Sequence, residues 1–192
     1  GYHAEEFLKG FSGYLICDGF SGYNKLKGVI RCGCLAHMRR YWNEALPGKS
    51  RKSSDKTPAE IGLNYCNQLF ELEKEYADLD ADTRKAKRLE TESAIWEAYW
   101  SWLETVKPAG GSRLAKAVTY AKNQKPYMEN YLLDGRCSIS NNIAENIARP
   151  YAVGRKNFLF HDTVKGARAS SIIYSLVETA KLNDLNIYAY LE

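Results

Sequence analysis

The chain has 192 residues, of which 45% are hydrophobic and 26% charged, as in an ordinary soluble globular protein with a buried core. No apolar run approaches the roughly 20 residues needed to span a bilayer, which excludes a membrane role. The 27 basic and 23 acidic residues leave a net charge of +4, an excess that permits a nucleic-acid partner without requiring one.

The cysteines favour a reducing compartment. They are odd in number, widely spaced and not preceded by a secretory signal, so we expect free thiols in a reducing cytoplasm. The chain also opens at Gly1 rather than Met, and its first strand-like run has no neighbouring strands before it. This start indicates an excised piece of a longer protein.

The first 46 residues alternate between short strands and helices. Residues 4–8 are expected to end a helix, and the apolar runs 14–17 and 29–32 are expected to form two buried strands around a glycine-rich turn. A helix is predicted over 35–46. Asp18 then falls at the carboxyl end of the first strand, where α/β proteins commonly place ligands and catalytic groups.

The middle of the chain predicts a helical insertion. Residues 49–56 are basic and serine-rich without a hydrophobic period, and are expected to form a linker. Apolar residues then recur at three- and four-residue steps from 59 to 103, which predicts two long helices packed as a hairpin. Two shorter helices are predicted over 113–122 and 125–132.

Aromatic residues of the second long helix permit two interpretations. They can stack on nucleic-acid bases, but their helical spacing favours packing inside the hairpin. The residues are Trp96, Tyr99, Trp100 and Trp102.

The last third predicts two more helices. Within 138–152, Asn142 is a good N-cap with Glu145 at the third helical position. Residues 157–160 are expected to be extended, and a helix over 164–182 is expected to end at Asn183.

Asp18 and Glu145 are the candidate catalytic acids, and each also has a purely structural interpretation. Asp18 precedes a glycine, and Asp-Gly is among the commonest turn dipeptides. Glu145 completes a capping box with Asn142 and stands four residues before Arg149, as in a helical ion pair.

A capping role does not explain the dense cations that follow Glu145. Such a cluster suits phosphate oxygens, which Arg holds as a fork and Lys as a point charge. Two Mg²⁺ ions held by carboxylates are the usual means of phosphoryl transfer on DNA. The cations are Arg149, Arg155, Lys156, Lys165 and Arg168.

Five ordered segments resemble transposases of the insertion sequence 66 family, and together they frame nearly the whole chain. The weakest part of the resemblance lies between residues 49 and 135. The chain departs from the family at Asn146, where Arg usually follows the glutamate. The segments read GYLICDGFSGY (13–23), CLAHMRR (34–40), NNIAENIARP (141–150), GRKNFLF (154–160) and ETAKL (178–182).

The resemblance implies a DDE transposase, a nucleotidyl transferase that cleaves transposon ends and joins them to target DNA. Its fold class is α/β, an RNase H-like core, here incomplete with its early strands missing, with a large α-helical insertion. The core occupies 1–46 and 134–192, and the linker and insertion occupy 47–133. Asp18 corresponds to the second metal-binding acid and Glu145 to the third.

The first acid is expected upstream of Gly1, so we expect the fragment alone to be inactive. The complete enzyme is expected to bind two Mg²⁺ or Mn²⁺ ions. DNA is the expected partner, with an oligomer in the DNA complex and nucleoid association, and neither a membrane nor a small-molecule substrate is expected. The expected DNA-binding residues are Arg149, Arg155, Lys156, Asn142, Arg39, Arg40 and His37.

Three alternatives remain beside this interpretation. Cys32, Cys34 and His37, with Cys137 or His161, form an unusually spaced candidate for zinc, which we do not expect. A structure-specific nuclease with the same core cuts DNA without joining ends. A non-catalytic DNA-binding or assembly module uses the helical hairpin as its interface.

Overall fold

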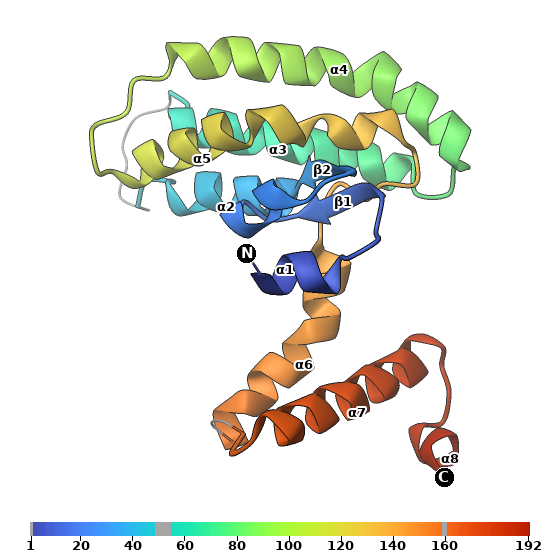
Figure 1. The fold of residues 1–192 in the computed structure, drawn as a ribbon. Helices are drawn as coiled ribbons and strands as arrows, with labels where there is room; N and C mark the ends of the chain where they lie inside the picture. Colours follow the sequence, from blue (N-terminus) through green and yellow to red (C-terminus); the bar gives the residue numbers. More distant parts are fainter. Residues whose placement is uncertain (1, 49–54, 159–160) are drawn as a thin grey trace. The chain divides into compact units, whose positions relative to one another are not determined.

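The structure is a computed structural model that describes residues 2–48, 55–158 and 161–192, with side chains described for 4–48, 55–154 and 161–192. Its contacts define two compact units, unit 1 over Gly1–Asn141 and unit 2 over Asn142–Glu192. Within the described residues the fold is mostly helical with one small parallel sheet, which is compatible with the α/β class (Figure 1). No helix there is long and apolar enough to cross a membrane.

The two predicted strands of unit 1 form a sheet, in which they run parallel. β1 (Gly13–Cys17) pairs with β2 (Val29–Gly33) in a register that sets Cys17 opposite Gly33. The short helix α1 (Tyr2–Phe7) precedes β1, and the 3-10 helix η1 (Ser21–Lys25) lies between the strands. The carboxyl ends of both strands therefore meet at one edge, where the Cys34 amide donates to the Cys17 carbonyl oxygen at 3.1 Å.

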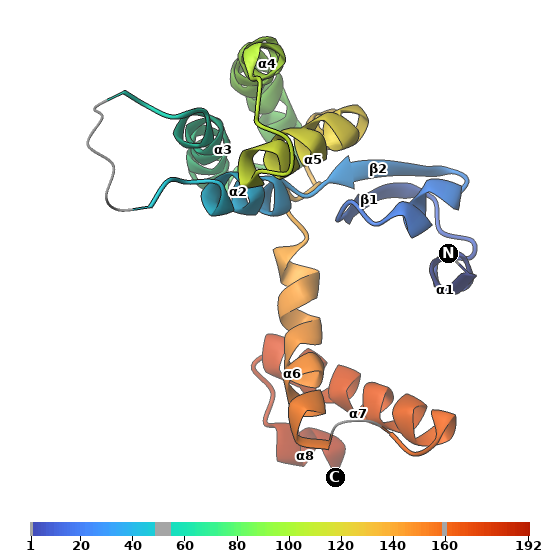
Figure 2. The ribbon, with the colours of Figure 1, turned by 90° about the vertical axis from the view of Figure 1, so that its left-hand side faces the viewer.

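Four helices complete most of unit 1, and the predicted long hairpin is confirmed. α2 packs against both α3 and α5, and α3 packs against α4. Figure 2 looks nearly along α3 and α4 and shows α2 and α5 beside them. The helices are α2 (Leu35–Glu44), α3 (Pro58–Glu75), α4 (Ala81–Thr105) and α5 (Arg113–Met128).

The aromatic residues of α4 form the core, which confirms their packing interpretation. Trp96, Tyr99 and Trp100 are at most 8% exposed. The Trp96 and Trp100 rings stack at 5.4 Å, and the Trp42 indole of α2 donates to the Tyr99 hydroxyl at 3.2 Å. These contacts join α2 to α4 across the unit.

The end of α5 differs from the prediction of two short helices. α5 continues without a break to Met128, and the 3-10 helix η2 (Asn130–Leu133) follows. Pro126 lies in the last turn of α5, and the buried residues Gln124 and Met128 on either side of it hold that turn in the core. Tertiary packing therefore overrides the local helix-breaking tendency of proline.

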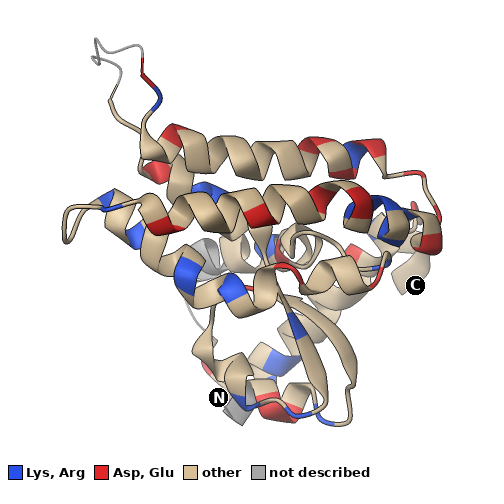
Figure 3. Cartoon of the chain, turned by 90° about the horizontal axis from the view of Figure 1, so that it is seen from above, with Lys and Arg blue, Asp and Glu red and all other residues tan. Residues whose placement is uncertain are grey.

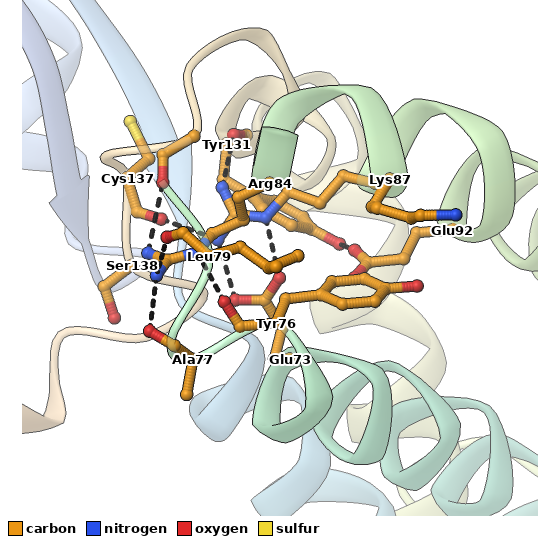
Figure 4. A network of polar contacts seen from close by, with 12 residues as sticks. Glu73, Tyr76, Ala77, Leu79, Arg84, Lys87, Glu92, Tyr131, Cys137 and Ser138 are labelled. Atoms are coloured by element: carbon orange, nitrogen blue, oxygen red, sulfur yellow. Dashed lines mark hydrogen bonds and ion pairs between the residues drawn. The ribbon is translucent and has the colours of Figure 1, made fainter. Parts of the chain in front are cut away.

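A buried polar network joins the hairpin to the segment after α5 (Figure 4). The Arg88 guanidinium, which is 0% exposed, donates to both carboxylate oxygens of Glu73 at 2.6 and 2.7 Å. It also donates to the carbonyl oxygens of Tyr131, Asp134 and Cys137. Arg88 on α4 therefore fixes residues 131–137, which lead towards unit 2.

Unit 2 consists of α6 (Asn142–Phe158), α7 (Val164–Leu182) and α8 (Ile187–Leu191). The predicted bounds of α7 and its C-cap at Asn183 are confirmed. Asn142 is the first residue of α6 rather than its cap, a difference of one position at a helix end.

The predicted extended segment 157–160 is wrong for its first two residues. Both belong to the last turn of α6, because the helix continues past Gly154 to Phe158. Residues 159–160 lie outside the described part of the chain, as do 49–54 of the predicted linker.

Candidate active site

Asp18 follows β1 directly, at the carboxyl edge of the sheet, and is half-buried. Its Oδ1 accepts a hydrogen bond from the backbone amide of Phe20 at 3.0 Å, which is the geometry of an aspartate turn. This bond uses one of the two carboxylate oxygens. The turn role is therefore real, and it is compatible with a second role for the same carboxylate.

The Asp18–Gly19 turn rests directly on α5. A Cβ atom built on Gly19 would lie 2.9 Å from Nε2 of Gln124 and 3.1 Å from Cε2 of Tyr120. At distances this short, a side chain at position 19 would require Gln124 or Tyr120 to shift. The glycine therefore permits close approach of the turn to α5, which the sequence assigns to the insertion.

Two oxygens beside this turn are buried without a hydrogen-bond partner in the described part of the chain, Oε1 of Gln124 and the hydroxyl of Tyr120. Burial is the main cause that raises the pKa of Tyr120, and the nearby Cys34, Tyr41 and Asp18 raise it further. The Arg40 charge opposes this rise.

The buried side chain of Arg31 lies next to Cys17, the last residue of β1. Arg31 of β2 is 8% exposed, donates to Oδ1 of Asn24 and stacks over the Tyr127 ring at 4.0 Å. Burial raises the pKa of the Cys17 thiol, and Arg31 partly offsets this through a hydrogen bond and its charge. The positive charge of Arg31 therefore lies next to Cys17, the residue before Asp18.

The two arginines of α2 face different surroundings. Nε of Arg39 donates to Oδ1 of Asn67 on α3 at 2.7 Å, so Arg39 contributes to the contact between these helices. Arg40 is exposed, and its charge acts on Tyr120 beside Asp18. His37 is half-buried on the same helix.

The charges on the helices of unit 1 are unevenly distributed (Figure 3). Acidic residues occur along both α3 and α4, whereas α5 carries four basic residues and no acidic one. A hollow of about 430 Å³ opens beside α5, lined by Tyr41, Lys116, Thr119, Tyr120 and Asn123 among others. Its wall includes the stacked rings of Tyr41 and Tyr120, 4.5 Å apart.

In unit 2, Asn142, Glu145 and Arg149 are three and four residues apart on α6, so they share one face of the helix. Glu145 is half-buried, and the other two are exposed. Arg155 and Lys156 belong to the same helix, but their side chains lie outside the described part. Asp18 thus belongs to unit 1 and Glu145 to unit 2.

The segment that leads to α6 runs beside the carboxyl edge of the sheet. The Leu35 amide donates to the Ile139 carbonyl oxygen at 3.0 Å, directly after the residue whose amide bonds Cys17. The side-chain amide of Asn130 donates to the carbonyl oxygen of Arg31 at 2.7 Å. Both bonds lie within unit 1 and fix this segment along β2.

The cysteines of the zinc alternative are buried. Burial, together with Cys137, raises the pKa of the Cys32 thiol to about 12. A thiol must lose its proton to bind a metal. Among the described residues, no three or more His, Cys, Asp or Glu side chains are grouped so that they can hold a metal ion.

Sequence reasoning missed Arg31, Tyr120 and Gln124. Gln124 offered a signal, because it follows Ala117 and Ala121 on the buried face of α5, where an apolar residue is expected. Burying a polar side chain at such a position costs free energy unless the side chain is hydrogen-bonded, so its presence calls for an explanation. Nothing local in the sequence links any of these residues to Asp18.

Comparison with known proteins identifies the family. Residues 1–169 match the Transposase IS66 family. The chain is 33% identical over 192 residues to uncharacterized protein y4qI of Sinorhizobium fredii, covering 93% of the chain and 34% of that protein. It is 28% identical to uncharacterized protein y4hP of the same organism, covering 100% of the chain and 38% of that protein. No solved structure matches.

The chain therefore spans about a third of the length of these curated relatives. The family match extends over most of the chain and includes both candidate acids, Asp18 and Glu145. The chain belongs to the IS66 family of transposases.

Proposed function

We propose that this chain is part of a DNA transposase whose phosphoryl-transfer site combines Asp18 with Glu145. Family membership supports the transposase class. The position of Asp18 after a parallel strand supports an RNase H-like core, in which the first 46 residues and the last third form one α/β domain around the helical insertion. Arg149 shares a helix face with Glu145 and is suited to hold a DNA phosphate.

One observation carries this proposal: the segment before α6 is hydrogen-bonded to the carboxyl edge of the sheet. Ile139 bonds Leu35, and the preceding residue Cys34 bonds Cys17, next to Asp18. Glu145 follows Ile139 by two residues of loop, Ser140 and Asn141, and the first turn of α6. Glu145 therefore comes shortly after this segment along the chain, as the proposed pairing with Asp18 requires.

The two acids suit a divalent cation because Mg²⁺ and Mn²⁺ prefer oxygen ligands. A pair of bound ions activates the attacking water or 3′-hydroxyl and stabilises the leaving oxygen. Asp18 keeps a second carboxylate oxygen beyond the one that accepts from Phe20, and the side-chain amide of Gln124, whose Oε1 has no partner in the described part of the chain, approaches the same turn through Nε2. These oxygens fit a hard cation better than zinc.

Cationic groups near the acids serve the DNA strand. Lys116 is exposed and lines the hollow next to α5, and Arg40 is exposed with its charge acting on Tyr120 in the wall of that hollow. Neither residue forms an ion pair in the described part of the chain. We expect both to contact phosphates, together with Arg149 and the predicted contacts at Asn142, Arg155 and Lys156. Arg39 and His37 stay predictions for the same role.

The test uses the product of the reading frame that encodes this chain, with DNA carrying the transposon ends. Asp18→Asn and Glu145→Gln should each abolish strand cleavage and joining at unchanged DNA affinity, whereas the exposed-site control Glu97→Gln should keep both. Retention of activity by either acid variant contradicts the catalytic assignment and favours a binding module. Cleavage without joining favours a nuclease.

A further inference from the structure

α5 places two buried polar side chains against the turn that holds Asp18. Nε2 of Gln124 and Cε2 of the Tyr120 ring approach Gly19 so closely that they would lie 2.9 and 3.1 Å from a Cβ atom built there. Gln124 is only 7% exposed, and its neighbours on this face of the helix, Ala117 and Ala121, are 0% exposed. The polar group therefore occupies a core position beside the candidate active site.

Both side chains bury an oxygen that has no hydrogen-bond partner in the described part of the chain, Oε1 of Gln124 and Oη of Tyr120. A buried polar atom without a partner destabilises a fold by about 1–3 kcal/mol. An apolar residue would avoid this cost at both positions. The arrangement is therefore explained if a donor occupies the site when the protein functions.

We propose that Gln124 and Tyr120 bind the hydration shell of the divalent cation that Asp18 holds, which makes α5 of the insertion part of the active site. This inference rests on the proposed function. Water bound to a cation donates strong hydrogen bonds, which is what the Gln124 carbonyl oxygen requires. The Tyr120 hydroxyl accepts such a bond in the same way. Both are positioning residues, because they act through the cation's water and not on the substrate.

The proposal separates two roles that Gln124 can have. If its amide only packs the core, replacing it changes folding stability and leaves cation binding unchanged. If the Gln124 oxygen binds the cation's water, replacing Gln124 by an apolar residue weakens cation binding. The same replacement removes a buried oxygen that has no partner in the metal-free protein, and so does not lower its stability. Residues that orient the groups around a metal typically change its affinity 10- to 100-fold, so the expected effect is large.

The experiment uses the product of the reading frame that encodes this chain. It measures the Mn²⁺ dissociation constant of that protein by electron paramagnetic resonance, together with its melting temperature with and without Mn²⁺. The variants are Gln124→Met, which keeps the length but removes the amide, and Tyr120→Phe, which removes only the hydroxyl. Gln68→Met on the exposed face of α3 is the matched control. Asp18→Asn tests the proposed function on which the inference rests.

We expect Gln124→Met to weaken Mn²⁺ binding about 10-fold or more, Tyr120→Phe to weaken it to a smaller extent, and both to melt no lower than the parent without metal. Gln68→Met should change neither quantity. Unchanged Mn²⁺ affinity in both α5 variants, with Asp18→Asn still abolishing binding, overturns this inference alone. Unchanged affinity in Asp18→Asn overturns the proposed function and the inference with it.

Discussion

The backbone amide of Leu35 donates to the carbonyl oxygen of Ile139 at 3.0 Å, although the two residues are about a hundred positions apart in the sequence. Through this bond, the segment that follows the insertion is held at the carboxyl edge of the sheet. Two further contacts hold the returning segment, from Asn130 to the Arg31 carbonyl and from Arg88 to the Cys137 carbonyl. Residues of the insertion thus help to hold the segment before α6 in place within unit 1.

Arg88 should be the most sensitive charged residue of the fold. Arg88→Met leaves the Glu73 carboxylate, which is 13% exposed, without its partner and frees three carbonyl oxygens. Breaking a buried ion pair from one side typically costs about 3–5 kcal/mol. We expect a loss of that size in the free energy of unfolding, measured by urea denaturation.

The exposed pair of Lys122 with Glu104 supplies the control, with side chains 45% and 61% exposed. Lys122→Met should cost less than about 1 kcal/mol. Equal losses in the two variants would show that the Arg88 network does not support the fold.

Glu92 should make stability depend on pH. Burial raises the pKa of its carboxyl from 4.5 to about 8, and Glu73 adds to this while Tyr131 and Arg88 oppose it. The folded protein therefore keeps a proton on Glu92 that the unfolded chain releases. Stability from this group is complete below pH 4.5 and is lost as pH rises to about 8.

Glu92→Gln removes this titration, because the amide is neutral at every pH. Across that range the free energy of unfolding of the parent should fall relative to the variant, by at most about 1.4 kcal/mol for each unit of pH. Urea denaturation at pH values of about 5, 6, 7 and 8 measures this fall in the free energy of unfolding. Parallel pH profiles of the two proteins would rule out a protonated Glu92.

Replacing Gly62 by alanine should destabilise the protein, although alanine normally stabilises a helix relative to glycine. A Cβ atom there would lie 2.5 Å from Cδ2 of Trp42, whose ring is 0% exposed. Gly62→Ala should therefore destabilise the protein by about 1–3 kcal/mol, exceeding the gain of about 1 kcal/mol in helix propensity. Thermal unfolding measures the change.

Two variants check this explanation. Ala98→Gly at an exposed position of α4 should show the normal sign, a loss of about 0.5–1 kcal/mol. Trp42→Phe combined with Gly62→Ala should cost less than the sum of the two single changes, because the smaller ring makes room. Strict additivity would show that the ring is not what excludes a side chain at position 62.

Local patterns predicted the strands, the hairpin of α3 and α4, and the exact bounds of α7, because hydrophobic spacing alone specifies them. They did not predict the continuation of α5 to Met128, which depends on core packing around Pro126. Asp18 was found from its place after a strand. Gln124 and Tyr120 were not, because contact with Gly19 joins residues about a hundred positions apart.

The most direct test of the central claim is a double-variant cycle on Mn²⁺ affinity, measured by electron paramagnetic resonance with Asp18→Asn, Glu145→Gln and their combination. If both carboxylates bind the same ions, each single variant should weaken Mn²⁺ binding about 10-fold or more, as expected for a lost ligand. The double variant should then bind Mn²⁺ scarcely more weakly than either single variant. Losses that simply add, or a Glu145→Gln variant with the affinity of the parent, would contradict a shared site.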